Sequence, residues 1–190
     1  MRIETRNLIL RDFEIVDFDS YHRLRSQAKF QRFYPEDKTT EIFSRELVEQ
    51  FMSQSLQHPR THFQFAIIDR TDQLIGSCGV RIVGDQIASI GCEFGTSFQG
   101  KGYAIEAGEM LLDFAFSSLK LKEVFAETNS ENFAALRLCR NLGMSLKSKQ
   151  AGYEVFKGRV WDRSILQLSS EDWFSRKNSE SMTDLTKPFI

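Results

Sequence analysis

A glycine-rich segment in the middle of the chain has the residue types of an anion-binding loop. It reads Gly95-Thr96-Ser97-Phe98-Gln99-Gly100-Lys101-Gly102-Tyr103-Ala104, between an alternating apolar stretch and a helical pattern. At such a junction the backbone N–H groups of the helix start point outward, and the helix dipole favours negative charge. Glycine lets a phosphate approach the backbone because it has no Cβ, and Lys101 can add a positive charge. The segment therefore predicts a phosphate-binding loop, with a plain tight connection as the alternative.

The same segment fits the first part of a nucleotide-binding P-loop. Gly95 to Lys101 satisfies G-x-x-x-x-G-K, but Gly102 stands where the motif needs a Ser or Thr to bind magnesium. The stretch before it belongs to a predicted antiparallel meander, whereas P-loops open a parallel sheet. A P-loop-like nucleotide binder is therefore the hypothesis that these residues support least.

Hydrophobic periodicity along the chain predicts one α+β domain that positions this loop. Alternating or short apolar runs predict strands at 8–10, 63–67, 74–83, 86–95, 124–128, 153–156 and 160–168. Apolar residues at helical spacing predict helices near 17–27, 42–56, 104–115 and 132–142, with Thr39 or Thr40 capping the second. We expect the domain to occupy residues 1–174, and a polar, mobile C-terminal tail to occupy 175–190.

The composition is that of an ordinary globular protein and excludes several classes of function. The chain has 190 residues and a formal net charge of -1 at pH 7, so its overall charge draws it neither to nucleic acid nor to anionic lipid. No apolar stretch reaches the roughly 18 residues of a membrane span, and we find no secretory signal. The three cysteines form no C-x-x-C motif, and the histidines show no metal-ligand spacing. We expect a cytoplasmic protein without a metal or a disulfide framework.

The loop residues also match a second motif, and other segments support the match. Gln99-x-x-Gly102-x-Ala104 resembles the Q/R-x-x-G-x-G/A signature of the GNAT superfamily of N-acetyltransferases. Residues 90–95, 106–116 and 132–144 resemble the strand and the two helices around this signature, and residues 4–11 and 156–173 resemble the two ends of the RimJ/RimL branch. The resemblance spans residues 1–174 in order. It implies a bent, mostly antiparallel seven-stranded sheet with helices on both faces.

The resemblance implies that the domain binds acetyl-coenzyme A (acetyl-CoA) and passes its acetyl group to an amine. The residues that would hold the pyrophosphate are Gln99, Gly100, Lys101, Gly102, Tyr103 and Ala104. The backbone of Phe94 and Gly95 would bind the pantetheine arm, whose amides can add to a sheet edge as a strand does. Asn132 matches a cofactor-contacting Asn of the family, and it is also a favourable helix N-cap. The implied cofactor site thus combines the loop, the strand before it and the start of a later helix.

The transfer needs a neutral amine and a polarised thioester carbonyl. The resemblance places Glu93 nearest the thioester, as a candidate base acting directly or through water; a structural or solvated carboxylate is the alternative. Glu127, on the next predicted strand, is a second candidate base. Cys139 stands where many family members have a Tyr that protonates the leaving thiolate, so it is either a candidate acid or a packing residue. The proton route stays open at this point.

The acceptor is the part of the reaction that the sequence constrains least. Phe30, Phe33 and Tyr34 lie in the region where the family closes over the acceptor, so we expect them to line that pocket or to join the core. The resemblance implies direct attack, in a ternary complex, by a small-molecule amine or a protein N-terminus, in a monomer or a homodimer. A non-catalytic module that binds or senses acyl-CoA is the alternative function.

Overall fold

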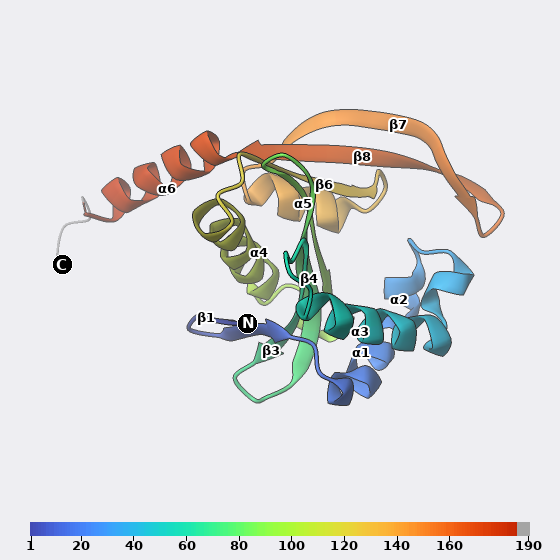
Figure 1. The fold of residues 1–190 in the computed structure, drawn as a ribbon. Helices are drawn as coiled ribbons and strands as arrows, with labels where there is room; N and C mark the ends of the chain where they lie inside the picture. Colours follow the sequence, from blue (N-terminus) through green and yellow to red (C-terminus); the bar gives the residue numbers. More distant parts are fainter. Residues whose placement is uncertain (186–190) are drawn as a thin grey trace.

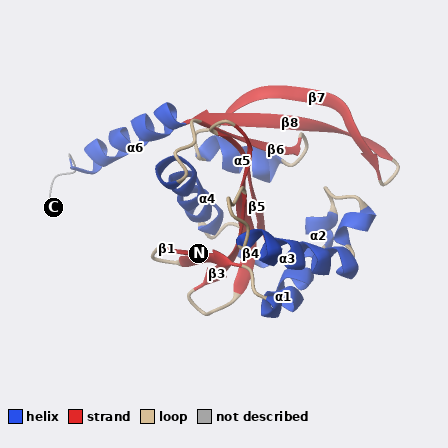
Figure 2. Cartoon of the chain, in the orientation of Figure 1, coloured by secondary structure: helices blue, strands red, loops and turns tan. Residues whose placement is uncertain are grey.

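A single mixed sheet of eight strands organises the molecule in the computed structural model, which describes residues 1–185 and the side chains of residues 1–179 (Figures 1 and 2). The strand order is β1-β2-β3-β4-β5-β6-β8-β7, antiparallel except for the parallel pair β5 and β6. The strands are β1 Arg2–Glu4, β2 Leu8–Asp12, β3 His62–Asp69, β4 Leu74–Gly84, β5 Ile87–Phe94, β6 Glu123–Asn129, β7 Ser145–Phe156 and β8 Arg159–Ser169. The predicted α+β class and mostly antiparallel sheet are confirmed. The extra strand is β1, which pairs with β2.

The described residues form six α-helices, four of which the periodicity predicts. The helices are α1 Phe18–Arg25, α2 Ala28–Gln31, α3 Glu41–Ser55, α4 Tyr103–Asp113, α5 Phe133–Asn141 and α6 Ser170–Leu185. Thr40 caps α3 as predicted, since its side chain accepts a hydrogen bond from the backbone N–H of Phe43. A π-helical turn, Phe114–Ser118, extends α4. The unpredicted helices are α2, which is a single turn, and α6.

The helices cover both faces of the sheet, and β3 shows why. Phe65 and Ile67 pack into the core under α4 and α5, whereas Ala66 and Ile68 pack into a second core under α1 and α3. Side chains alternate between the faces of a strand, so the unbroken apolar run 65–68 of β3 is buried on both sides. Each large apolar side chain buried in this way contributes about 1.5–3 kcal/mol. The two cores hold the helices on opposite sides of the sheet.

The pairing of β5 with β6 is short, and this determines where the site lies. The two strands pair over three residues, which end at Ser89 opposite Phe125. Beyond that point β6 pairs only with β8, and in the described chain residues 90–94 of β5 have no strand partner on that side. Figure 1 shows β6, β8 and β7 crossing the top of the molecule, with β3 and β4 below. An open strand edge therefore lies inside the fold.

The C-terminal third differs from the sequence-based prediction in two ways. The hairpin of β7 and β8 is longer than predicted, and at its tip Lys157 donates a hydrogen bond to the carbonyl of Gln31, at the end of α2, at 2.6 Å. The predicted domain boundary after residue 174 falls inside α6, where Trp173 is buried and donates to Asp113 at 3.1 Å. Residues 175–185 thus continue a helix that packs at its start, rather than forming a separate tail; residues 186–190 lie outside the described part.

Within the described residues, no helix is both long enough and apolar enough to cross a membrane.

Candidate active site

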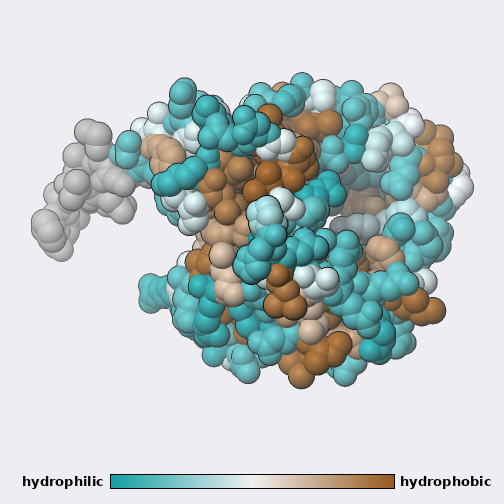
Figure 3. Space-filling model, in the orientation of Figure 1, coloured by the Kyte–Doolittle hydropathy of each residue, from teal (hydrophilic) through white to brown (hydrophobic). Residues whose placement is uncertain are grey.

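A cavity of about 650 Å³ lies where β5 and β6 diverge. On one side it is lined by α4, α5 and β6, including Leu111, Asn132 and Cys139. On the other side it is lined by α3 and the strands β3 and β4, including Gln54 and Gln64. The open edge of β5, from Ile90 to Glu93, runs between the two sides. Figure 3 shows the molecule hollowed between the β7–β8 half and the half that carries α2 and α3. The cavity therefore has walls from elements on both sides of the β5 edge.

The glycine-rich loop leads from β5 into α4 and presents open backbone. Gly100 and Gly102 have left-handed φ angles of 78° and 84°, which glycine adopts without strain. A Cβ added to either residue would meet no atom within 4 Å, so the backbone faces open space. The N–H groups of Tyr103 and Ala104, in the first turn of α4, have no backbone or side-chain acceptor among the described residues. An anion can be held there by exposed N–H groups and the helix dipole.

Side chains from the start of the chain hold this loop and the first turn of α4. Gln27 accepts hydrogen bonds from the backbone and hydroxyl of Thr96, at 2.9 and 2.7 Å. Lys29 donates to the side chain of Gln99 at 2.9 Å. On α4, burial would raise the pKa of the Glu106 carboxyl, but hydrogen bonds from Thr5 and Asn7 outweigh it and hold this pKa below its usual value. That ionised carboxylate anchors the helix to the β1–β2 turn.

Of two further predicted cofactor residues, Asn132 lines the cavity and Lys101 does not. Asn132 lines the cavity and caps α5, with its side-chain oxygen accepting from the N–H of Ala135 at 3.2 Å. This placement is compatible with Asn132 as a cofactor contact and with Asn132 as a helix N-cap. Lys101 is exposed on the loop, with its ammonium 5.6 Å from the centre of the Phe98 ring, which leaves the charge accessible.

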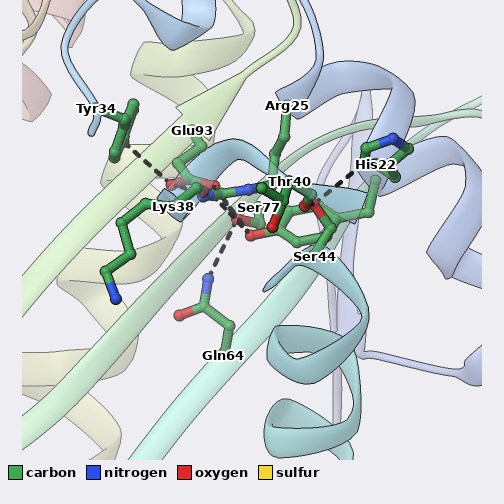
Figure 4. A network of polar contacts seen from close by, with 10 residues as sticks. His22, Arg25, Tyr34, Lys38, Thr40, Ser44, Gln64, Ser77 and Glu93 are labelled. Carbon is green, nitrogen blue, oxygen red and sulfur yellow. Dashed lines mark hydrogen bonds and ion pairs between the residues drawn. The ribbon is translucent and has the colours of Figure 1, made fainter. Parts of the chain in front are cut away.

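Glu93 lines the cavity but is bound by five hydrogen bonds (Figure 4). Arg25, whose side chain is 3% exposed, donates to both carboxylate oxygens at 3.0 and 3.1 Å. Tyr34 and Tyr21 each donate at 3.1 Å, and Ser77 donates at 3.4 Å. Burial, and next the charge of Glu93, raises the pKa of both phenols, so both remain protonated donors. These donors occupy both carboxylate oxygens with partners from the protein itself. The contacts thus favour the structural interpretation of Glu93 over the role of a base.

The hydrogen bonds around Glu93 connect three parts of the chain. Arg25 also donates to the carbonyl of Lys38 at 2.8 Å, which fixes the segment after α2. On the other side of Glu93, Ser77 accepts from Gln64 at 3.2 Å. Sequence reasoning missed Arg25 and Tyr21. They are one turn apart on the predicted helix, but nothing in that spacing indicates a carboxylate some 70 residues away.

The structure places only some of the other predicted catalytic and acceptor residues in the cavity wall. Glu127 lines the cavity but pairs with Arg163 at 2.8 Å. Tyr34 lines the cavity, and Phe30 stacks on its ring at 5.0 Å between ring centres. Phe33 instead packs edge-on against Trp161 of β8, with the ring centres 6.0 Å apart. Of the three aromatic residues predicted for the acceptor side, Tyr34 alone is in the cavity wall.

Cys139 lines the cavity on the α5 side and is a buried thiol. Burial is the main cause that raises its pKa to about 11. An ordinary thiol has a pKa of about 8.5, so Cys139 is a weaker acid than the conjugate acid of a typical thiolate. Proton donation from Cys139 to a leaving thiolate would be uphill. The position therefore fits packing, which is the second interpretation that the sequence allows.

Comparison with known proteins agrees with this geometry. Residues 7–145 match the family model described as an acetyltransferase (GNAT) domain. An uncharacterized N-acetyltransferase, p20, of Bacillus licheniformis is 28% identical over 172 residues, which cover 89% of this chain and 96% of the relative. The ribosomal-protein-S5-alanine acetyltransferase of Vibrio fischeri has a TM-score of 0.77 at 16% identity, covering 91% of this chain and 98% of the other. The spermidine N-acetyltransferase of Vibrio cholerae, solved with CoA and spermine, has a TM-score of 0.76 at 20% identity, with coverage of 90% and 99%. These two structures share the fold.

Proposed function

The chain belongs to the acetyltransferase (GNAT) domain family, and we propose that it transfers the acetyl group of acetyl-CoA to a primary amine. The observation that carries this proposal is the cavity at the divergence of β5 and β6, which is lined by α4, α5 and β6 on one side and by α3, β3 and β4 on the other. Donor and acceptor can then meet at the edge of β5. That arrangement supports direct attack in a ternary complex.

The residues on the donor side fit acetyl-CoA. The open backbone of Gly100 and Gly102 and the free N–H groups at the start of α4 suit a pyrophosphate, with Lys101 adjacent. The unpaired edge of β5 next to Phe94 suits the amides of a pantetheine arm. The bound thioester supplies an activated acetyl group. Backbone N–H groups along the β5 edge can polarise its carbonyl oxygen, as an oxyanion hole does.

Neither of the two carboxylates that line the cavity is free to take the proton of the amine. Glu93 is held by Arg25 and two tyrosines, and Glu127 is held by Arg163. An amine bound in the cavity must lose its proton before it attacks, and water in the open cavity is then the acceptor. We therefore expect kcat/KM to rise with pH and to level off near the pKa of the amine used, rather than near that of an enzyme side chain.

The experiment that tests the function measures thiol release from acetyl-CoA with a panel of primary amines at several pH values. The proposal predicts acetylated products, identified by mass spectrometry, and a pH midpoint that moves with the pKa of the acceptor. Tight CoA binding without turnover of any amine or peptide would instead support the non-catalytic acyl-CoA-binding module. Magnesium-dependent ATP binding would support the nucleotide binder.

Replacing Cys139 with alanine is expected to lower kcat by less than about threefold, because a thiol with its raised pKa adds little as an acid, whereas an effective general acid contributes about 10²–10⁴-fold. The measurement is the initial rate of acetyl transfer between about pH 6 and 9, where this thiol stays protonated. Cys139→Ser serves as the near-isosteric control. A loss of about 100-fold in the alanine variant with unchanged CoA affinity would restore Cys139 to the role of acid.

A further inference from the structure

The acidic and basic side chains that line the cavity differ in whether they have partners among the described residues. The two lining carboxylates, Glu93 and Glu127, are each paired with an arginine. Arg81, on β4, lines the same cavity and makes no ion pair, hydrogen bond or ring contact with any described residue through its side chain. His62, its partner in the β3–β4 register, also lines the cavity. The accessible charge on the acceptor side is therefore positive.

The positions on β4 and β5 place this charge at a distance from Glu93. Ser77, Gly79 and Arg81 lie on one face of β4, since side chains alternate, and they pair with Glu93, Gly91 and Ser89 of β5. Ser77 and Arg81 are four residues apart, so their backbones are separated by about 13 Å. Between them Gly91 leaves the floor open, since a Cβ there would meet no atom within 4 Å, and the side chain of Gln64 lies against Gly79. A molecule can lie along this floor between the β5 edge and Arg81.

The walls above the floor are neutral and can form hydrogen bonds. Gln50 and Gln54, one turn apart on α3, line the cavity, and neither side chain has a partner among the described residues. A polyamine or a cationic peptide would need unpaired carboxylates here, because a second ammonium group beside Arg81 would be repelled. An acceptor with a negative group at its far end would instead meet a free guanidinium.

We propose that the acceptor is a primary amine that also carries a carboxylate, and that Arg81 is the residue that selects it. This inference rests on the proposed acetyl transfer. The amine lies toward the edge of β5, and the carboxylate lies toward Arg81, whose planar guanidinium can bind both carboxylate oxygens. His62 flanks the same end of the floor and can donate a further hydrogen bond.

The test uses three matched series of acceptors of increasing length: ω-amino acids, their amides and the corresponding diamines. The ω-amino acid is expected to exceed its amide in kcat/KM by roughly 10- to 100-fold, as for a hydrogen-bonded charge pair. The chain length that gives the highest kcat/KM indicates the distance between the β5 edge and Arg81. Arg81→Met should reduce this preference to about one, mainly through KM. Arg81→Glu should reverse it and favour the diamine. Arg81 is exposed, so both variants should fold, which their thermal midpoints will verify.

Arg23→Met is the matched control, because Arg23 is exposed on α1 and does not line the cavity. It should keep the preference for the carboxylate. The inference would be wrong if the native enzyme prefers diamines or amides. It would also be wrong if Arg81→Met keeps the preference for the carboxylate. Either result would leave acetyl transfer intact. If no acceptor in the three series releases CoA thiol but another primary amine or a peptide does, the inference about the carboxylate fails and acetyl transfer stands. If no amine or peptide releases it, the proposed function itself fails.

Discussion

Replacing Gly102 with glutamate is expected to weaken the binding of CoA by at least about 100-fold, because a carboxylate placed in the loop repels the pyrophosphate at a cost of several kcal/mol. The fold should survive, since a Cβ at this position meets no atom within 4 Å. The left-handed φ of 84° adds about 1–2 kcal/mol of backbone strain, which most domains tolerate. The affinity can be measured by calorimetric titration of CoA into the purified variant.

Two control variants separate the effect of the added charge on CoA affinity from the effects of backbone strain and of general instability. Gly102→Ala carries the same backbone strain without the charge, so it should lose much less affinity than the glutamate variant. Gly158→Glu adds the same charge at another open, left-handed glycine, in the turn between β7 and β8, and should bind CoA normally. Unchanged affinity in Gly102→Glu would contradict the assignment of the loop. An equal loss in Gly102→Ala would show that strain, not charge, is responsible.

Replacing Glu93 with glutamine is expected to lower the free energy of unfolding by about 3–5 kcal/mol, because Arg25 would remain buried without its counter-charge. Arg25→Met should cost a similar amount by leaving the carboxylate without its main partner. The double variant should lose much less than the sum, since it removes both charges together. Urea unfolding at neutral pH measures all three values.

The pair Arg163 and Glu127 is the matched control, because Glu127 also lines the cavity but the pair is more exposed, at 18% and 33% of the side chains. Glu127→Gln should cost only about 0–1 kcal/mol, as exposed pairs do. If Glu93→Gln were no more destabilising than Glu127→Gln and instead lowered kcat by about 100-fold or more, Glu93 would be the base after all. A strong effect on stability without a matching loss of kcat would support the structural role of Glu93.

The local features of this protein can be predicted from its sequence because their causes are local. Helical spacing predicts α1, α3, α4 and α5, and alternation predicts the β3–β4–β5 meander, since each pattern repeats within a few residues. The glycine-rich loop is also encoded locally, because left-handed backbone and the start of a helix require particular residues at fixed positions. The missed β1 and α2 are only three and four residues long, too short to show a period.

What the sequence could not determine depends on contacts between distant residues. The roles of Glu93 and Arg81 differ because Glu93 is bound by an arginine 68 residues away, whereas Arg81 has no side-chain partner in the described part of the chain. Neither fact can be predicted from the spacing of residues along the sequence. The start of α6 also makes a contact with a distant residue, because the buried Trp173 donates a hydrogen bond to Asp113. The sequence by itself determined the family, the loop and most of the elements. The tertiary structure alone decided which charges are neutralised, because neutralisation depends on distance in space rather than along the chain.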